Sequence, residues 1–273
     1  MTDNLFDVNG KCVAIAGAAG VLCGEMARAL ASRGAKVAVL DIMDDAAAKL
    51  CEEIRAADGE AHPVHCNVLE KEGVQRALDE AVAALGGVDV LVNGAGGNKK
   101  EATCLPPETL FFDIPADAVR FVFELNIVGT MLPCQVFGRH MAERGAGAIV
   151  NISSMCAFRP LTRIAGYSAA KAAVSNFTQW LAVYMCQNHS PNIRVNAIAP
   201  GFFDTQQNHY LLFDEAENLT PRGEQIVAHT PMGRFGTPAE LIGTLIWLIS
   251  DAAKFVSGIV VPVDGGFSAY SGV

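Results

Sequence analysis

Short apolar runs alternate along this chain with longer segments in which apolar residues recur every three or four positions. Apolar runs of about four to eight residues predict buried strands, and the longer recurrence predicts amphipathic helices packed beside them. The predicted strands are residues 11–17, 36–41, 61–68, 88–96, 147–154, 193–201 and 258–266. The predicted helices are residues 24–35, 44–59, 70–85, 115–143, 166–187 and 238–253.

The alternation of strands and helices predicts one parallel sheet with helices on both faces, because each parallel strand is reached through a crossover connection. A chain of 273 residues suits one large domain. We therefore expect a single-domain, Rossmann-type α/β fold over residues 1–273, with a doubly wound parallel sheet of about seven strands. Residues 202–236 follow a predicted strand without a clear pattern, and we expect them to form a substrate loop or lid.

Small and polar residues stand at the carboxyl ends of the predicted strands, where open parallel sheets bind their ligands. They are Asn67-Val68, Asn93-Gly94-Ala95-Gly96, Ser153-Ser154 and Pro200-Gly201. Their recurrence strand after strand is hard to explain by core packing. It suits a cofactor laid across that edge of the sheet.

The stretch AGAAGVLCGEMA follows the first predicted strand and is rich in small residues. Gly17, Gly20 and Gly24 permit a tight turn whose backbone N–H groups can approach a pyrophosphate. Such turns are common, but Asp41 ends the second predicted strand about 20 residues further on, where a carboxylate can accept both adenosine ribose hydroxyls. This anion would repel a 2′-phosphate, so NAD is favoured over NADP.

The stretch GYSAAKAAVSNF places Tyr167 and Lys171 four residues apart on one face of a predicted helix. A pair of surface side chains is the simple alternative explanation. Only small residues separate the two, so a flat ligand could lie against that helix face.

Composition and charge exclude some classes of function. The net charge of −9 argues against a nucleic-acid or anionic-membrane surface, although a local basic pocket could still bind an anionic small molecule. The eight cysteines form no CxxC pair and no zinc spacing with histidine, so we expect reduced structural thiols, no metal site and a cytoplasmic location. We see no signal peptide and no apolar run of the roughly 18 residues that a membrane helix needs.

In order and spacing, these motifs resemble the short-chain dehydrogenases/reductases over essentially the whole chain. The resemblance rests on the glycine turn at 17–24, Asp41, NGAG at 93–96, Asn126, NISS at 151–154, YSAAK at 167–171, PGFFDT at 200–205 and VDGG at 263–266. It implies an NAD-dependent oxidoreductase that acts on CH–OH groups.

The resemblance also implies roles for single residues. Tyr167 would exchange a proton with the substrate. Lys171 would hold the nicotinamide ribose and, together with the positive nicotinamide, lower the pKa of Tyr167. Ser154 would bind the substrate oxygen, with Ser153 as second candidate, and Asn126 would hold a proton-relay water. The implied cofactor contacts are Gly17, Gly20, Val21, Leu22, Asp41, Ile42, Asn67, Val68, Asn93, Ala95, Gly96, Tyr167, Lys171, Pro200, Gly201, Phe203 and Thr205.

The glycine turn departs from the family pattern, which usually reads Thr-Gly-x-x-x-Gly-x-Gly. Ala16 replaces the threonine, and Val21 and Cys23 replace the second and third glycines. The valine removes backbone freedom, but N–H groups of Val21 and Leu22 can still face the phosphates. Asn67 also stands where an aspartate is common, and an amide can still contact adenine.

Two clusters of cations bear on the substrate. Asn98 and Lys99 follow the NGAGG stretch, while Arg159 and Arg163 lie between Ser154 and the YSAAK motif. Both segments line the substrate pocket in the family. Arginine binds carboxylates bidentately, so a small anionic or polyhydroxylated substrate is favoured. Solvated or subunit-interface charges are the alternative.

The cluster sequences are most similar to the sugar-acid (mannonate oxidoreductase) branch of the family, which implies interconversion of D-mannonate and D-fructuronate. A gluconate 5-dehydrogenase-like enzyme and a 3-oxoacyl reductase are alternatives within the family. A non-catalytic dinucleotide-sensing module is an alternative outside enzymology. The family's usual assembly implies a homo-oligomer, either a dimer or a tetramer.

Overall fold

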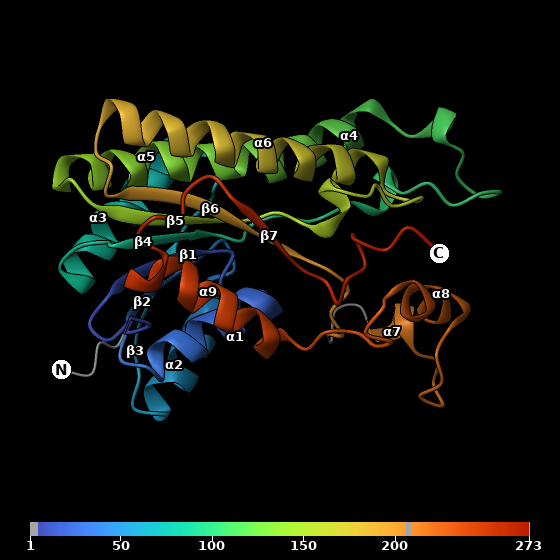
Figure 1. The fold of residues 1–273 in the computed structure, drawn as a ribbon, viewed down its shortest axis with the longest axis horizontal. Coiled ribbons are helices and arrows are strands. Elements are labelled where there is room, and N and C mark those ends of the chain that lie inside the picture. Colours follow the sequence, from blue (N-terminus) through green and yellow to red (C-terminus); the bar gives the residue numbers. More distant parts are fainter. Residues whose placement is uncertain (1–4, 206–208, 273) are drawn as a thin grey trace.

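The computed structural model describes residues 5–205 and 209–272 (Figure 1). Within these residues, seven parallel strands form one sheet in the order β3-β2-β1-β4-β5-β6-β7. The strands are β1 (Cys12–Ala16), β2 (Lys36–Asp41), β3 (Glu60–His65), β4 (Val90–Asn93), β5 (Gly147–Ile152), β6 (Ile193–Pro200) and β7 (Val260–Val263). The prediction of a single-domain, doubly wound parallel sheet of about seven strands is confirmed.

Helices cover both faces of the sheet, which explains why its central strands are almost continuously apolar. The helices are α1 (Val21–Ala31), α2 (Asp44–Ala56), α3 (Lys71–Leu85), α4 (Ala116–Phe123), α5 (Gly129–Arg144), α6 (Ala165–Asn188), α7 (His209–Leu212), α8 (Pro221–His229) and α9 (Ile242–Ile249). Figure 1 shows α1, α2 and α9 on one face of the sheet and α5 and α6 on the other. Along β1, Val13 and Ile15 pack toward the first group, whereas Ala14 and Ala16 pack toward the second.

The register of the central strands brings their carboxyl ends to one edge. Ala16 at the end of β1 lies opposite Leu40 of β2 and Asn93 of β4. Asn93 in turn lies opposite Asn151 of β5. The predicted clustering of polar strand ends therefore has its structural basis in this shared edge.

The predicted helix 115–143 is one continuous element, α4 and α5 joined by a π-helical turn at Glu124–Val128. By length and composition alone, this helix of 29 residues could cross a membrane, although Arg120, Glu124 and Arg139 interrupt its apolar residues, so it contains no apolar run of 18 residues. Half of its apolar window is buried inside the protein, where it packs against α3 and α6. This packing accounts for its apolar character.

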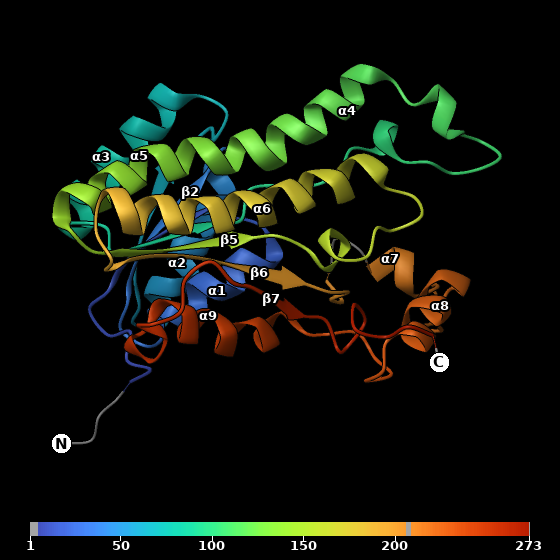
Figure 2. The same ribbon diagram turned by 45° about the horizontal axis from the view of Figure 1, so that its top comes forward.

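Two irregular segments extend beyond the carboxyl edge of the sheet, whereas we expected one. The segment at 202–236 contains α7 and α8, which lie beside the C-terminal residues in both views (Figures 1 and 2). Residues 206–208 of this segment lie outside the described residues. The second segment, 94–115 between β4 and α4, contains two short 3₁₀ turns and an isolated bridge between Leu105 and Thr109, and it projects past the end of α6 (Figure 2).

Candidate active site

The glycine turn lies between β1 and α1 and packs against the end of β4. Gly17 has a φ of +72°, and a Cβ there would lie 2.7 Å from the backbone of Ala95, so only glycine fits. Helix α1 begins at Val21, three residues before the predicted start. The N–H groups of Val21 and Leu22 therefore open the helix and have no intrahelical acceptor, as binding of a pyrophosphate requires.

Cys23 explains how the turn accommodates its departure from the family pattern. The Cys23 side chain is buried, and a Cβ on Gly94 would overlap its Sγ atom. Burial raises the pKa of the Cys23 thiol to about 12, so the side chain packs as a small neutral group. In the described part of the chain, no group of three or more His, Cys, Asp or Glu side chains could hold a metal ion.

Asp41 is buried at the end of β2, beside the glycine turn. Its Oδ2 atom accepts the N–H of Ala19 at 2.9 Å, and its Oδ1 atom accepts the N–H of Met43 at 3.0 Å. Each carboxylate oxygen keeps acceptor capacity for a hydroxyl. A cavity of about 620 Å³ runs from the turn to Thr205. The fixed carboxylate and the helix N–H groups fit the ribose and pyrophosphate of a dinucleotide.

The other expected cofactor residues line the same edge with different groups. Asn93 uses its side chain in the core, where Nδ2 donates to Asn151 Oδ1 at 2.9 Å, so a cofactor would meet its backbone. The Asn67 side chain bonds Glu70 and the Leu69 N–H, next to buried Val68. Ile42 is largely exposed after Asp41. Gly201, after Pro200, must be glycine because a Cβ would lie 2.6 Å from Asp264.

Tyr167 and Lys171 lie in the first two turns of α6. Lys171 is 3% exposed, and its Nζ atom donates to the Ile152 carbonyl at 2.8 Å. The same ammonium lies 5.6 Å from the centroid of the Tyr167 ring. The two side chains therefore meet beside the end of β5, and the alternative of a surface pair is wrong.

Two neighbouring serines at the end of β5 differ in their freedom to bind a substrate. Ser153 is buried, and its hydroxyl contacts the Lys171 carbonyl at 3.1 Å and the Ser175 hydroxyl at 2.7 Å. Ser154 is half-buried; its Oγ atom accepts the Cys156 N–H at 3.3 Å and hydrogen-bonds the Tyr167 side chain. This geometry favours Ser154 over Ser153 as the partner of a substrate oxygen.

Asn126 links the long helix to the same place. In the π-helical turn, Asn126 Nδ2 donates to the Val122 carbonyl at 2.8 Å. The Gly97 backbone bonds both amide atoms: its N–H donates to Asn126 Oδ1 at 3.1 Å, and its carbonyl accepts from Nδ2 at 2.7 Å. A Cβ on Gly96 would lie 2.7 Å from Asn126 Oδ1 and 3.1 Å from Lys171 Nζ. Gly96, which follows β4, therefore lies next to both the Asn126 and the Lys171 side chains.

Burial dominates the electrostatics of this cluster. It lowers the pKa of Lys171 to about 8. It also raises the pKa of Tyr167 well above its usual range; the nearby Cys156 adds to the rise, and the hydrogen bond from Ser154 opposes it. We expected Lys171 and a bound nicotinamide together to lower the pKa of Tyr167. Within the protein alone, desolvation of the phenolate is the largest effect and raises this pKa.

A cavity of about 630 Å³ opens next to this cluster and contains two of the expected substrate residues, Arg159 and Arg163. Leu161, Phe202 and Phe267 line the cavity and also belong to the apolar cluster that packs on the Tyr167 ring. The expected residues Asn98 and Lys99 are not among its lining; Asn98 bonds Thr103, and Lys99 lies over the Phe121 ring.

The cavity also contains residues that the sequence did not reveal. Arg222 and His229 come from α8, and Tyr270 comes from the C-terminal segment. These residues belong to no motif, and their positions follow from how α8 folds back over the sheet edge. The only hint in the sequence is that Arg222 and His229 lie within the irregular stretch at 202–236.

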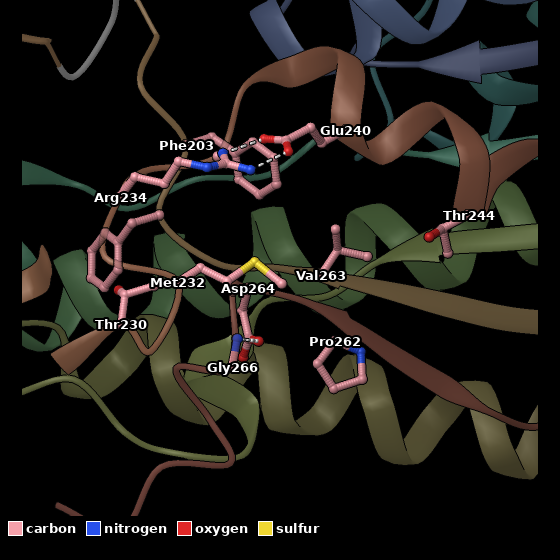
Figure 3. A pocket seen from close by; sticks show the side chains of 13 residues that line it. Phe203, Thr230, Met232, Arg234, Glu240, Thr244, Pro262, Val263, Asp264 and Gly266 are labelled. Atoms are coloured by element: carbon pink, nitrogen blue, oxygen red, sulfur yellow. Dashed lines mark hydrogen bonds and ion pairs between the residues drawn. The ribbon is translucent and has the colours of Figure 1, made fainter.

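A second cavity, of about 390 Å³, lies at the loop that follows β6 and shares Phe202 with the first cavity (Figure 3). Arg234 forms two ion-pair contacts with Glu240 in its lining, at 2.8 and 2.6 Å (Figure 3). The Arg234 guanidinium lowers the pKa of Glu240 to about 2. Asp204 and Gly236 are joined by a backbone hydrogen bond, so both ends of the α7–α8 segment are fixed here.

Comparison with known proteins agrees with this architecture. Residues 17–268 match a family model described as enoyl-(acyl carrier protein) reductase, adh_short_C2. The chain is 45% identical over 273 residues to a Bacillus subtilis protein named "Uncharacterized oxidoreductase UxuB", covering 97% of each chain.

Two solved structures are also similar. One, with bound NAD, is provisionally named a D-mannonate oxidoreductase from Haemophilus influenzae; it is 47% identical with a TM-score of 0.92, covering 98% of both chains. The other is a gluconate 5-dehydrogenase from Burkholderia cenocepacia in complex with NADP and tartrate, 31% identical with a TM-score of 0.86 over 98% of both chains. Sequence, fold and site geometry together place this chain in the short-chain dehydrogenase/reductase family of oxidoreductases.

Proposed function

We propose that the chain is an NAD-dependent dehydrogenase/reductase of a secondary alcohol or ketone in a small sugar acid. The observation that carries the proposal is the convergence of Ser154, Tyr167, Lys171 and Asn126 beside a cavity lined with arginines. The carboxyl edge of the parallel sheet offers a binding site for the dinucleotide next to these groups. When bound, the nicotinamide supplies the chemistry of hydride transfer.

Each side chain has a separate role in this proposal. Tyr167 gives or takes the proton of the substrate oxygen, and Ser154 fixes that oxygen by a hydrogen bond. Lys171 holds the ribose next to the nicotinamide. Asn126 orders the backbone at Gly97 and positions the relay that returns the proton to solvent.

The proposed cofactor is NAD. The turn at Gly17 and Gly20, with the first N–H groups of α1, receives the pyrophosphate, and Asp41 receives the adenosine ribose. The buried Asp41 carboxylate would repel the 2′-phosphate of NADP. The remaining contacts expected along the edge run from Ala95 and Gly96 to Phe203 and Thr205.

D-mannonate and D-fructuronate are the proposed substrate pair. The Haemophilus structure supports this choice, and the arginine-lined cavity supports an anionic substrate. The similarity to the Burkholderia enzyme supports a gluconate 5-dehydrogenase-like reaction as second candidate. A 3-oxoacyl reductase and a non-catalytic dinucleotide sensor find less support, because the cavity is cationic and the Ser–Tyr–Lys set is complete.

We also propose a cytoplasmic homo-oligomer, a dimer or tetramer. Trp180 and Tyr184 stack on the exposed face of α6, with ring centroids 5.1 Å apart, and are suited to a contact between subunits.

The experiment that tests the proposed function is a screen of hexonates and hexuronates with NAD and NADP, followed by the absorbance of the reduced cofactor. We expect oxidation of D-mannonate or another hexonate, with NAD preferred about tenfold or more because of Asp41. Asp41→Asn should narrow this preference. NADH binding without turnover of any compound would contradict the proposal and favour the sensor.

A further inference from the structure

We propose that Arg222 of α8 and Arg163 form a clamp that binds the substrate carboxylate between two separate elements that line the cavity. The proposal rests on the proposed function and names a specificity residue for it. One of these elements is the loop 159–163, which directly precedes α6, and the other is α8, which lines the cavity together with the C-terminal segment. Arg163 is held in place because its carbonyl accepts the Cys104 N–H at 2.8 Å.

The three cavity arginines lack anionic partners. Across residues 5–205 and 209–272, Arg159, Arg163 and Arg222 form no ion pair and no hydrogen bond through their side chains, whereas Arg28, Arg144 and Arg234 each pair with a carboxylate. The described lining of the cavity also contains no aspartate or glutamate. An acidic protein of net charge −9 thus concentrates three unpaired cations in one hollow, which an anionic ligand would neutralise.

Arg163 and Arg222 act on one another as like charges. Burial lowers the pKa of Arg222, and the Arg163 charge lowers it further. A carboxylate between the two guanidinium groups would replace this repulsion by two charge-assisted contacts. Binding of the anion would therefore draw α8 toward the loop 159–163, and a neutral polyol would lack this effect.

The position of the clamp relative to Tyr167 defines the class of substrate. Tyr167 packs on the apolar cluster that includes Phe202 and Phe267, and both of these residues line the cavity. Tyr167 is not itself part of the lining, so the reacting carbinol would lie at the margin of the cavity beside these rings, and the carboxylate would extend into the cavity to the clamp. Thr162, Gln225 and Tyr270 place neutral hydrogen-bonding groups in the lining, which suits the hydroxyls of a polyhydroxy acid.

The test compares D-mannonate with its uncharged counterpart D-mannitol in Arg222→Gln, Arg222→Lys and Arg163→Gln. The matched control is Arg76→Gln, which removes the same charge from the exposed surface of α3. For Arg222→Gln we expect the KM for D-mannonate to rise roughly tenfold to a hundredfold, as for loss of a hydrogen bond to a charged group. The kcat should change little, and Arg222→Lys should lie between Arg222→Gln and wild type.

Two further readouts separate a clamp from a structural role. The affinity for NADH should remain at the wild-type value in all variants, and the small activity toward D-mannitol should not fall. An unchanged KM for D-mannonate in Arg222→Gln would overturn the clamp, as would equal losses for D-mannonate and D-mannitol.

Calorimetric binding of D-mannonate to the wild-type protein with NADH distinguishes failure of the clamp from failure of the proposed function. Binding that weakens in Arg222→Gln without any turnover would refute the proposed function and leave the clamp standing. If D-mannonate is turned over and its KM does not change in Arg222→Gln, the clamp is refuted and the proposed function stands.

Discussion

Burial sets the protonation of the two side chains on which the proposed chemistry depends. The pKa of Tyr167 is raised, so at neutral pH the phenol carries its proton. This state suits donation to the oxygen of a ketone that is being reduced. Lys171, with its pKa lowered to about 8, is buried at a cost that a purely structural lysine would not justify, as is typical of functional sites.

Gly96 provides a test of the geometry at the scale of one residue. In Gly96→Ala, the new Cβ would lie 2.7 Å from Asn126 Oδ1 and 3.1 Å from Lys171 Nζ, so one of these side chains must move. We expect a loss of about 1–3 kcal/mol in unfolding free energy and a fall of at least about tenfold in kcat/KM. Thermal unfolding and steady-state kinetics measure the two effects.

The neighbouring Gly97 supplies the control, because a Cβ there meets no atom within 4 Å among the described residues. Gly97→Ala should retain nearly wild-type stability and activity. Equal behaviour of the two variants would show that the convergence of Gly96, Asn126 and Lys171 has no bearing on catalysis.

At the scale of elements, the spacing of apolar residues predicted those helices and strands in which that spacing follows the period of the element. Tyr167 and Lys171 could be placed together from the sequence because they lie one turn apart on α6. Asp41 could be placed at the sheet edge because it ends a strand. These inferences needed only the geometry of one element and the direction of a parallel sheet.

Features that depend on contacts between elements could not be predicted in this way. The π-helical turn at Glu124–Val128 is stabilised by the Asn126 side chain, which bonds a backbone segment 29 residues away. The position of Arg222 depends on α7 and α8 folding back, and the two ends of this segment are joined by the backbone hydrogen bond between Asp204 and Gly236. Asn98 and Lys99 were expected to line the substrate pocket because the family resemblance places their segment there, but their side chains contact Thr103 and the Phe121 ring.

At the scale of the whole molecule, the buried thiols predict how stability depends on pH. Burial raises the pKa of Cys51 to about 11 and of Cys23, Cys66 and Cys134 to about 12, from a usual value near 9. Above pH 9 the unfolded chain loses these protons first, so the folded state becomes less stable as pH rises. Each thiol lowers the unfolding free energy by about 1 kcal/mol per pH unit. Lys171 acts in the opposite direction, because between pH 8 and 10.5 the unfolded chain keeps one proton that the folded protein has lost.

We therefore expect the unfolding free energy to fall steeply between pH 9 and 11 in denaturant titrations under reducing conditions. Cys66→Ala should make this slope shallower by about 1 kcal/mol per pH unit. Cys186→Ala removes an exposed thiol of α6 and should leave the slope unchanged. If the pH dependence of the unfolding free energy is the same in Cys66→Ala and in the wild type, burial of the Cys66 thiol is not a cause of the fall in stability.

The most direct test of the central claim is the rate of hydride transfer in Tyr167→Phe, measured in a single turnover of D-mannonate with NAD. The substitution removes only the hydroxyl, so we expect the rate to fall about 10²–10⁴-fold while the affinity for NADH stays at the wild-type value. Tyr184→Phe, on the outer face of the same helix, should react at the wild-type rate. A Tyr167→Phe protein that transfers hydride as fast as the wild type would contradict the assignment of Tyr167 as the group that takes the hydroxyl proton in this direction.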